Sequence, residues 1–238
     1  ANGDDNLFGL DGDDTLFGDF LPAFDSGGGA DNLFGGSGVD RMWGGTANDV
    51  LQGGAGGDTL SGDGGIDTAD YDGAPVNGTT TGVDVNLQAG TGSGSDAQGD
   101  VLSAIENVRG SSFGDTITGH DAGTNSGVNI LSGEDGNDFL FGREGNDLLY
   151  GGALTDQLFG GSGFDTMFGG AAADTLPDGA GGSNGVTGTT VVDNFVGDGG
   201  QDFVSYLNAA LGVTVNLSTN TGTGGNATHD TSSQLEHV

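Results

Sequence analysis

Aspartates recur every nine residues in two parts of the chain, and an apolar side chain follows each of them two positions later. The repeating unit reads Gly-Gly-x-Gly-x-Asp-x-apolar-x, with in-phase copies that begin at Gly35, Gly44 and Gly53, and again at Gly133 and Gly142. Carboxylate and backbone oxygens are the ligands that hard cations prefer. Each unit therefore combines a turn, an anionic group able to bind a cation, and a residue for a hydrophobic core.

The elements that position these aspartates must be very short strands. A helix with up to three glycines in each unit would lose about 1 kcal/mol for every interior glycine relative to alanine. A strand of about three residues centred on the apolar position fits better, because its two neighbours then point outward. Two units would complete one coil, with strands alternating between two facing parallel sheets. The sequence therefore predicts an all-β chain, a right-handed parallel β-roll in which each unit stacks on the second unit after it.

The apolar position of the unit predicts the core of this roll. Short strands cannot be stable alone, so these side chains must pack between coils that stack on one another. The predicted core residues are Leu7, Leu16, Leu33, Met42, Leu51, Leu60, Ile117, Leu131, Leu140, Leu149, Leu158, Met167 and Leu176.

The negative charge of the repeat aspartates predicts that a cation holds stacked turns together. Stacked turns lie about 4.8 Å apart, so aspartates of units i and i+2 approach each other. At an effective dielectric of about 20, two carboxylates roughly 5 Å apart repel by about 3 kcal/mol. A divalent cation shared between the turns would replace this repulsion by attraction, because each carboxylate would then face a positive charge. Glycine turns can adopt positive φ and bring carbonyl oxygens to such an ion, where a Cβ would obstruct them.

Calcium is the best candidate for this cation, since it accepts about six to eight oxygens in a flexible geometry. Magnesium is less suited because it demands near-octahedral geometry and keeps its waters. Metals that prefer soft ligands are less suited again, because the chain has no cysteine and its three histidines, His120, His229 and His237, are scattered. We expect about eight to twelve calcium ions, one for each stacked pair of turns.

The overall composition is that of a glycine-rich polyanion, with 54 glycines, three Lys plus Arg and a net charge of −32. Such a composition is typical of disordered chains. Disorder lacks a fixed period, however, and here acidic and apolar residues occupy separate positions of one unit. The scarcity of basic residues argues against nucleic-acid binding. No apolar run approaches the ~20 residues of a membrane span, and no signal peptide is recognisable.

The repeat divides the chain into four predicted parts. Residues 1–70 form a first roll block, with a break in phase at 18–25 where a proline and two phenylalanines indicate an inserted loop. Residues 71–114 form a β spacer without the repeat, and residues 115–180 form a second roll block. Residues 181–238 form a second spacer, a truncated copy of the first.

The duplication of the spacer is visible in short segments. Val83–Leu87 alternates as a half-buried strand, and Val213–Leu217 repeats it. Tyr206 likewise repeats Tyr71. We expect plain β packing at the end of a roll to be the main role of these spacers. Neither end of the chain shows a cap, and solenoids need caps, so we expect the chain to be a segment of a longer protein.

The repeats resemble those of the RTX (repeats-in-toxin) family, the haemolysin-type calcium-binding nonapeptide repeats, over most of the chain. The resemblance implies a parallel β-roll that folds on meeting calcium outside the cell, after secretion as an unfolded chain. It also implies that the repeat aspartate supplies a side-chain ligand and that the glycine-rich turn supplies carbonyls.

Matching positions then give the candidate ligands. The aspartates are Asp5, Asp14, Asp31, Asp40, Asp49, Asp58, Asp67, Asp115, Asp138, Asp147, Asp156, Asp165 and Asp174. The glycines are Gly36, Gly38, Gly45, Gly54, Gly56, Gly136, Gly145, Gly152, Gly161 and Gly163. Four departures predict weaker sites: Asn129 stands in place of aspartate, and Ala47, Leu154 and Ala172 stand in place of the fourth-position glycine.

One segment matches a catalytic pattern. Gly110–Gly114 fits G-x-S-x-G, with Ser112 in the position of the nucleophile. That pattern needs a strand leading into a helix, with an acid and a histidine placed downstream, whereas here a repeat restarts at Asp115. The chain has neither an H-E-x-x-H zinc motif nor a Walker-type phosphate loop. We therefore expect no enzymatic activity from this segment.

The last position of the unit is often aromatic. If alternate units stack, Phe141 lies over Phe159 on one sheet and Tyr150 lies over Phe168 on the other. Such ladders can simply cover backbone and favour strand formation. They can also form an apolar strip for lateral contact with a spacer, a neighbouring repeat module or another copy of the chain.

Two functions are compatible with this sequence. The first is an extracellular calcium-binding module that folds on Ca²⁺ binding, as part of a structural or adhesive surface or matrix protein; the duplicated roll and spacer favour it. The alternative is the calcium-triggered folding and type I secretion tail of a secreted enzyme or toxin whose catalytic domain lies outside this segment. In both cases, we expect the chain to be secreted, since calcium sites of modest affinity fill outside the cell.

Overall fold

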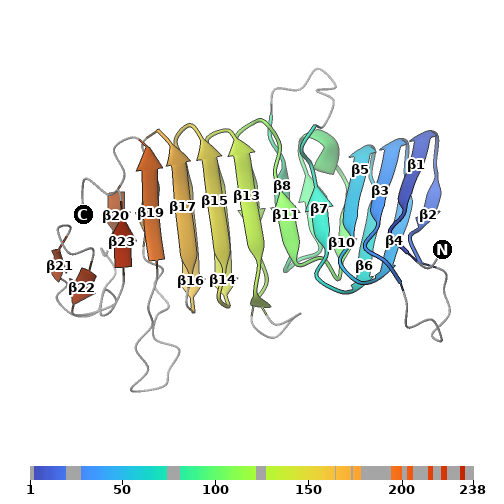
Figure 1. Ribbon diagram of the computed structural model, residues 1–238. Helices are drawn as coiled ribbons and strands as arrows, with labels where there is room; N and C mark the ends of the chain where they lie inside the picture. The colour runs from blue at the N-terminus through green and yellow to red at the C-terminus, as the bar shows by residue number, and fades with distance from the viewer. Residues whose placement is uncertain are drawn as a thin grey trace. The chain divides into compact units, whose positions relative to one another are not determined.

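The structure is a computed structural model, which describes residues 3–19, 28–73, 81–121, 127–163, 165–172 and 174–177, together with later strands. The chain forms two compact units, Ala1–Thr116 and Ile117–Val238. Each unit contains two facing sheets made mainly of parallel strands (Figure 1). Among the described residues, no helix is long and apolar enough to cross a membrane.

The first unit alternates its strands between two sheets. One sheet has the order β1-β3-β5-β7-β11, and the other has the order β2-β4-β6-β10-β9-β8. The strands are β1 (Asn6–Asp11), β2 (Thr15–Phe17), β3 (Asn32–Ser37), β4 (Arg41–Thr46), β5 (Val50–Ala55), β6 (Thr59–Gly64), β7 (Thr68–Asp70), β8 (Asp84–Asn86), β9 (Thr91–Ser93), β10 (Val101–Ser103) and β11 (Asn107–Arg109), with a short 3₁₀ helix, η1 (Ser95–Ala97), before β10.

The second unit is built in the same way. One sheet has the order β13-β15-β17-β19-β23-β22-β21, and the other has the order β12-β14-β16-β18-β20. The strands are β12 (Thr116–Thr118), which begins at the border of the unit, β13 (Ile130–Asp135), β14 (Phe139–Glu144), β15 (Leu148–Ala153), β16 (Gln157–Ser162), β17 (Thr166–Ala171), β18 (Thr175–Pro177), β19 (Asn194–Gly199), β20 (Phe203–Ser205), β21 (Thr214–Asn216), β22 (Thr221–Thr223) and β23 (Thr231–Ser233).

The pairing confirms the predicted parallel β-roll. Most roll strands pair in parallel with the second strand after them, so that Leu33 lies opposite Leu51 and Leu149 lies opposite Met167. Two nonapeptides therefore complete one coil, as the repeat predicts. Figure 1 shows β13, β15 and β17 side by side and pointing the same way.

The strands in the middle of each block are longer than predicted. They span six residues, as in β3 and β14, because they continue through the first three residues of the next unit. The second-position glycine has positive φ and still takes part in the ladder: Gly36 has φ 110° and lies opposite Gly54. Other roll strands, such as β2 and β7, have the predicted length of three residues.

The core is the predicted apolar row. Burial of each such side chain relative to an exposed one contributes about 1.5–3 kcal/mol, so the row supplies the main hydrophobic stabilisation of both units. Leu16 and Ile117 are buried, Leu7 in the first coil is half-buried, and the side chain of Leu176 lies outside the described residues. The row members with no exposed surface in the two blocks are Leu33, Met42, Leu51, Leu60, Ile117, Leu131, Leu140, Leu149, Leu158 and Met167.

The predicted break in phase appears as a change of register. Asn6 of β1 lies opposite Asn32 of β3, an offset of 26 residues, where later coils have an offset of 18. The first coil therefore holds extra residues without losing the parallel pairing. Most of the predicted loop at 18–25, from residue 20 onward, lies outside the described residues.

The spacer continues the roll of the first unit. Leu102 of β10 lies opposite Leu60 of β6, and Val108 of β11 lies opposite Ala69 of β7, both in parallel register. Before these two returns to the roll register, β8 and β9 form an antiparallel hairpin whose Val85 is fully buried. The spacer is thus a coil with an added hairpin.

The second unit repeats this hairpin. Val85 lies opposite Gly92 in the first spacer, and Val215 lies opposite Gly222 in the second. Strand β20 still pairs in parallel with β18 before this point, so the roll register extends into the region that we assigned to the second spacer. Tyr206 lies outside the described residues.

The edge turns require positive φ at the second and fourth positions of the unit. Every glycine that we proposed as a carbonyl ligand has this conformation. Ala47, Leu154 and Ala172 also adopt it, with φ of 79°, 77° and 89°. A left-handed conformation costs a residue with a Cβ roughly 1–2 kcal/mol. The three departures from glycine thus keep the turn geometry at the expense of backbone strain.

The predicted aromatic ladders are confirmed. Phe141 stacks on Phe159 with ring centroids 4.8 Å apart, and Tyr150 stacks on Phe168 at 5.1 Å, with interplanar angles of 10°. The first unit has two further stacked pairs, Phe8 with Phe34 and Phe17 with Trp43. Tyr150 is 38% exposed, so the ladder reaches the surface of its sheet.

Candidate metal centre

Most repeat aspartates are buried along the two edges of each roll, where each joins one coil to another, whereas Asp5 and Asp14 in the first coil are half-buried. The Oδ1 atom of Asp49 accepts a hydrogen bond of 2.8 Å from the backbone N–H of Asp31, and Oδ1 of Asp67 accepts one of 2.7 Å from the N–H of Asp49. The partners are 18 residues apart, one full coil. The carboxylates therefore form a continuous hydrogen-bonded ladder parallel to the stack.

The ladder of the second unit follows the same rule. The N–H of Asn129 donates to Oδ1 of Asp147, and the N–H of Asp147 donates to Oδ1 of Asp165, both at 2.8 Å. On the other edge, the N–H groups of Asp138 and Asp156 donate to the Oδ1 atoms of Asp156 and Asp174. Asn129 takes its full place in the ladder, because its own Oδ1 accepts from the N–H of His120 at 2.8 Å.

Two acids, one in each of the two ladders of the first unit, were missed by the sequence analysis. The N–H of Asp58 donates to Oδ1 of Asp100, and the N–H of Asp67 donates to Oε2 of Glu106, both at 2.8 Å. Both acids lie in the spacer, and both are buried. A signal for them exists in the sequence, since Leu102 follows Asp100 and Val108 follows Glu106 at the spacing that holds in every repeat.

The second carboxylate oxygen differs from the first. Within the described part of the chain, the Oδ2 atoms of Asp31, Asp40, Asp49, Asp58, Asp67, Asp147 and Asp156 are buried and accept no hydrogen bond. A buried charged group without a partner is strongly unfavourable. The repeated orphan oxygen therefore indicates a ligand that binds in the edge turns.

The first glycine of each unit leaves room at this oxygen. A Cβ at Gly35 would lie 2.5 Å from Oδ2 of Asp40 and 2.5 Å from the carbonyl oxygen of Gly53. A Cβ at Gly142 would likewise lie 2.5 Å from Oδ2 of Asp147 and from the carbonyl oxygen of Gly160. Both contacts are closer than real Cβ atoms allow. These first-position glycines were absent from our candidate ligands, although the repeat contains them.

The second and fourth positions face carbonyls of the neighbouring coil. A Cβ at Gly54 would collide with the carbonyl oxygen of Gly36, and one at Gly56 would collide with that of Gly38. Gly152 stands in the same relation to the carbonyl oxygen of Glu134. Each edge therefore stacks carbonyl oxygens close to the row of carboxylates.

Burial dominates the electrostatics of the ladder. It raises the pKa of Asp156 to about 8, of Asp67 and Asp147 to about 7, and of Asp49 to about 6. The charge of the stacked neighbour Asp31 raises the pKa of Asp49 further, as a smaller cause. Loss of solvent around each carboxylate is thus the largest cause of the raised pKa values, and the predicted repulsion between stacked carboxylates adds to it.

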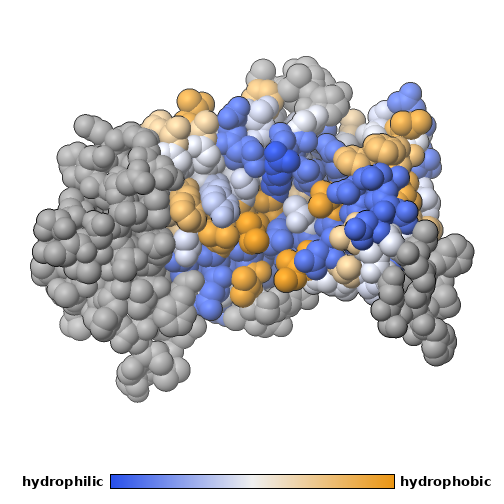
Figure 2. Space-filling model, in the orientation of Figure 1, coloured by the Kyte–Doolittle hydropathy of each residue, from blue (hydrophilic) through white to orange (hydrophobic). Residues whose placement is uncertain are grey.

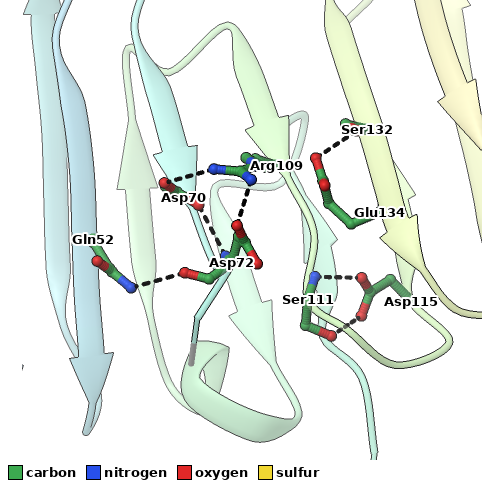
Figure 3. Close-up of polar contacts among 8 residues, drawn as sticks. All are labelled: Gln52, Asp70, Asp72, Arg109, Ser111, Asp115, Ser132 and Glu134. Carbon is green, nitrogen blue, oxygen red and sulfur yellow. Dashed lines mark hydrogen bonds and ion pairs between the residues drawn. The ribbon is translucent and has the colours of Figure 1, made fainter. Parts of the chain in front are cut away.

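Asp115 differs from the other predicted ligands. Its Oδ1 accepts hydrogen bonds from the N–H of Val83 at 2.7 Å and from the hydroxyl of Ser111 at 2.8 Å, while its Oδ2 accepts from the N–H of Ser111 at 2.6 Å. Figure 3 shows Ser111 facing both oxygens of this carboxylate. Asp115 therefore already has protein donors at both oxygens. The role of each individual residue as an ion ligand stays a prediction.

The side chain of Arg109, in the spacer, pairs with acids that do not belong to the row of repeat aspartates. Arg109 forms ion pairs with Asp70 and Asp72, and the carbonyl oxygen of Asp72 accepts a hydrogen bond from the side-chain amide of Gln52 (Figure 3). These contacts fasten the end of β7 to the spacer strand β11. They lie on the outer surface of the roll, apart from the buried carboxylate row.

The donor set fits calcium. It consists of carboxylate and carbonyl oxygens on flexible turns, with no nitrogen or sulfur ligand at the repeat positions. Within the described ranges, no three His, Cys, Asp or Glu side chains gather as in a metal centre built from side chains alone. Backbone oxygens must therefore supply much of the coordination. The residues that would hold the ion are the repeat aspartates, through Oδ2, and the turn carbonyls.

Comparison with known families agrees with this geometry. The family model of the RTX calcium-binding nonapeptide repeat matches residues 1–20, 24–42, 34–69, 123–158 and 150–186, together more than half of the chain. The chain belongs to this family, and it is a calcium-binding RTX repeat module with a β-roll fold. RTX repeats are typical of secreted proteins. No curated protein matches the chain in a sequence search.

Replacement of Asp147 separates the two roles of a repeat carboxylate. Asp147→Asn keeps the Oδ1 acceptor, as Asn129 does naturally, but removes the charge that binds the ion. We expect this variant to bind fewer calcium ions by calorimetry and to be more ordered than the wild type in chelator. Asp147→Ala also leaves the N–H of Asn129 without its acceptor, which costs about 1–3 kcal/mol more in chemical denaturation.

The matched control is Asp84→Asn, which removes one charge from an exposed position of β8. Its calcium stoichiometry should equal that of the wild type. An Asp147→Asn protein with unchanged calcium binding would show that the orphan Oδ2 atom is not a ligand.

Acidification should stabilise the roll when calcium is removed. The pKa values of Asp49, Asp67 and Asp156, about 6, 7 and 8, lie above the ordinary value of 3.8. The folded state therefore binds more protons than the unfolded chain between about pH 4 and pH 8, and its stability falls as the pH rises through this window. We expect the β signal in circular dichroism of the chelated protein to grow from about pH 8 to pH 5.

Two conditions test this explanation. High salt at about pH 8 screens general repulsion between exposed charges, and it should not reproduce the effect of acid if burial of the carboxylates is the main cause of their raised pKa values. With calcium present, protons compete with the ion, so acid should lower calcium affinity. Loss of β signal on acidification in chelator would contradict the assignment.

Proposed function

We propose that this module is an extracellular, calcium-stabilised building unit of a structural or adhesive surface or matrix protein. The observation that carries the proposal is the continuity of roll and spacer. Asp100 and Glu106 continue both carboxylate ladders, and β10 and β11 continue both sheets of the first unit. A spacer that remains in register extends the stack and does not end it, which suits a long load-bearing array.

Calcium supplies the condition under which such an array becomes stiff. The ladder carboxylates are buried, and their ionised form is unfavourable until a cation binds. Binding free energy then becomes folding free energy. Calcium-sensor affinities leave such sites empty at cytosolic calcium levels and fill them outside the cell, so the chain would remain unfolded until export. The proposed location is therefore the outer surface of the cell or its matrix.

We propose no catalytic role for the segment. Ser112, the residue in the position of the nucleophile, lies in an exposed bend that is followed by β12 and not by a helix. The nearby Asp115 accepts its hydrogen bonds from Ser111 and Val83. The local structure thus favours a turn that starts the next coil.

Surface labelling tests the proposed location and role. Antibodies against this segment should label intact producing cells or their matrix, and chelation of calcium should release or soften the labelled material, because the roll loses its stabilising ions. Recovery of the segment only as the tail of a soluble secreted enzyme or toxin would contradict a structural role and would favour the export-tail alternative.

The aromatic ladders offer a surface through which copies of the module could associate. In the second unit, Phe141 and Phe159 form one stacked pair and Tyr150 and Phe168 form another, on different sheets. Figure 2 shows apolar side chains gathered over the strands of this unit, with hydrophilic residues around them. A second copy of this chain is the proposed occupant. The net charge of −32 opposes its approach, so association should need bound calcium.

Serine substitutions test this contact. Phe141→Ser with Phe159→Ser removes one ladder and should lower the calcium-dependent mass measured by light scattering, while calcium stoichiometry stays unchanged. Leu154→Ser is the matched control, since Leu154 is 56% exposed but lies in an edge turn and not on the ladder. If the double variant and the wild type reach the same mass in light scattering, the ladder is not part of the interface.

A further inference from the structure

The turn that precedes Asp100 differs from every nonapeptide turn. Asp100 stacks on Asp58 as the next member of the ladder, at 2.8 Å from its N–H. A Gly-Gly-x-Gly turn would normally lead into such a residue, but here the 3₁₀ helix η1 (Ser95–Ala97) does so. The roll thus meets a turn of different sequence at this edge.

The spacer turn lies against the last nonapeptide turn of that edge. A Cβ at Gly57 would lie 3.3 Å from the carbonyl oxygen of Gly99 and 3.5 Å from that of Gln98. Between nonapeptides stacked one coil apart, the adjacent fourth position faces a glycine carbonyl, as Gly56 faces that of Gly38. The spacer therefore provides carbonyl oxygens close to where a repeat would provide them.

Asp96, within η1, adds a buried carboxyl group beside the row of repeat aspartates. Its side chain is buried, with 3% of the residue exposed, and its Oδ2 accepts no hydrogen bond within the described part of the chain. Asp58 beside it has the same property at Oδ2. The carbonyl oxygen of Ala97, the residue after Asp96, accepts a hydrogen bond of 3.1 Å from the N–H of Asp100, and Oδ1 of Asp100 accepts one from the N–H of Asp58, so η1 lies beside the turn that holds Asp58.

Two buried carboxylates with unused oxygens need either protons or a cation. No basic side chain of the described residues pairs with Asp96 in an ion pair. Tyr71 uses its hydroxyl on Asp100, to whose Oδ2 it donates at 3.0 Å, and so it does not serve Asp96. A divalent cation would satisfy Asp58 and Asp96 together, and nearby backbone carbonyls would complete an all-oxygen set.

We propose that Asp96 and Asp58 bind a calcium ion between the last nonapeptide turn and η1, at a site that belongs to the spacer and not to the repeat. Gln98 and Gly99 supply the adjacent carbonyl oxygens. A nonapeptide site draws side-chain ligands from the repeat aspartate row, whereas this site adds a carboxylate from outside the repeat. More negative charge among the ligands favours tighter calcium binding. The site would fasten the spacer to the roll.

The test compares Asp96→Asn with the control Asp84→Asn, in the whole chain. Calorimetric titration of calcium should show one ion fewer for Asp96→Asn, or one site weakened at least tenfold, while the control matches the wild type. In chelator, Asp96→Asn should be at least as ordered as the wild type by circular dichroism, because a buried charge has been removed. An unchanged calcium isotherm for Asp96→Asn would overturn the proposal and assign Asp96 a protonated, structural role.

A second measurement does not depend on counting all ions. Terbium can replace calcium, and its luminescence is excited through nearby tyrosine; Tyr71 contacts Asp100 at this end of the ladder. Tyr71→Phe removes the part of the terbium luminescence that is excited through Tyr71. Asp96→Asn should remove the same part, because terbium would no longer bind beside it. Equal terbium signals in Asp96→Asn and the wild type would again contradict the site. The test concerns the isolated chain, so its outcome is independent of where the module is displayed.

Discussion

The buried carboxylate of the repeat aspartate is the interaction on which the rest of this structure depends. One oxygen accepts a backbone hydrogen bond from the coil before it, as Asp67 does from Asp49, and so fixes the register of the stack. The other oxygen is buried without a hydrogen bond. The first interaction stabilises the coil, and the second destabilises it until a cation binds. We therefore propose that the same residue builds the roll and makes its stability depend on calcium.

This dependence follows from how little else the chain can bury. Each nonapeptide contributes one fully buried apolar side chain, such as Leu140 or Leu149, and several glycines that lose much conformational entropy on folding. The hydrophobic row alone opposes that entropy weakly. The positive φ of Leu154 and Ala172 adds further strain to the edge turns. We therefore expect ion binding at the edge turns to supply the contribution that favours the ordered stack.

The sequence predicts the periodic part of this fold well, because one nine-residue pattern fixes the apolar row, the parallel pairing and the aromatic ladders. It predicts the electrostatics less well. A pattern shows that Asp49 and Asp31 are stacked, but it does not show that burial raises the pKa of Asp49 more than the charge of Asp31 does. Strand length was also missed, since a glycine such as Gly36 can remain paired at positive φ. Asp115 has the spacing of a repeat aspartate, yet its carboxylate already accepts hydrogen bonds from Ser111.

The spacer separates two features that coincide in the repeats. Asp100 and Glu106 have no Gly-Gly-x-Gly turn before them, yet they join the ladder and their strands join the sheets. What they share with the repeats is an acid followed two residues later by a buried apolar side chain, Leu102 or Val108. Stacking therefore depends on the acid-x-apolar element, while the glycines shape the turn for the ion. A sequence can consequently lose the glycine signature and still continue the roll.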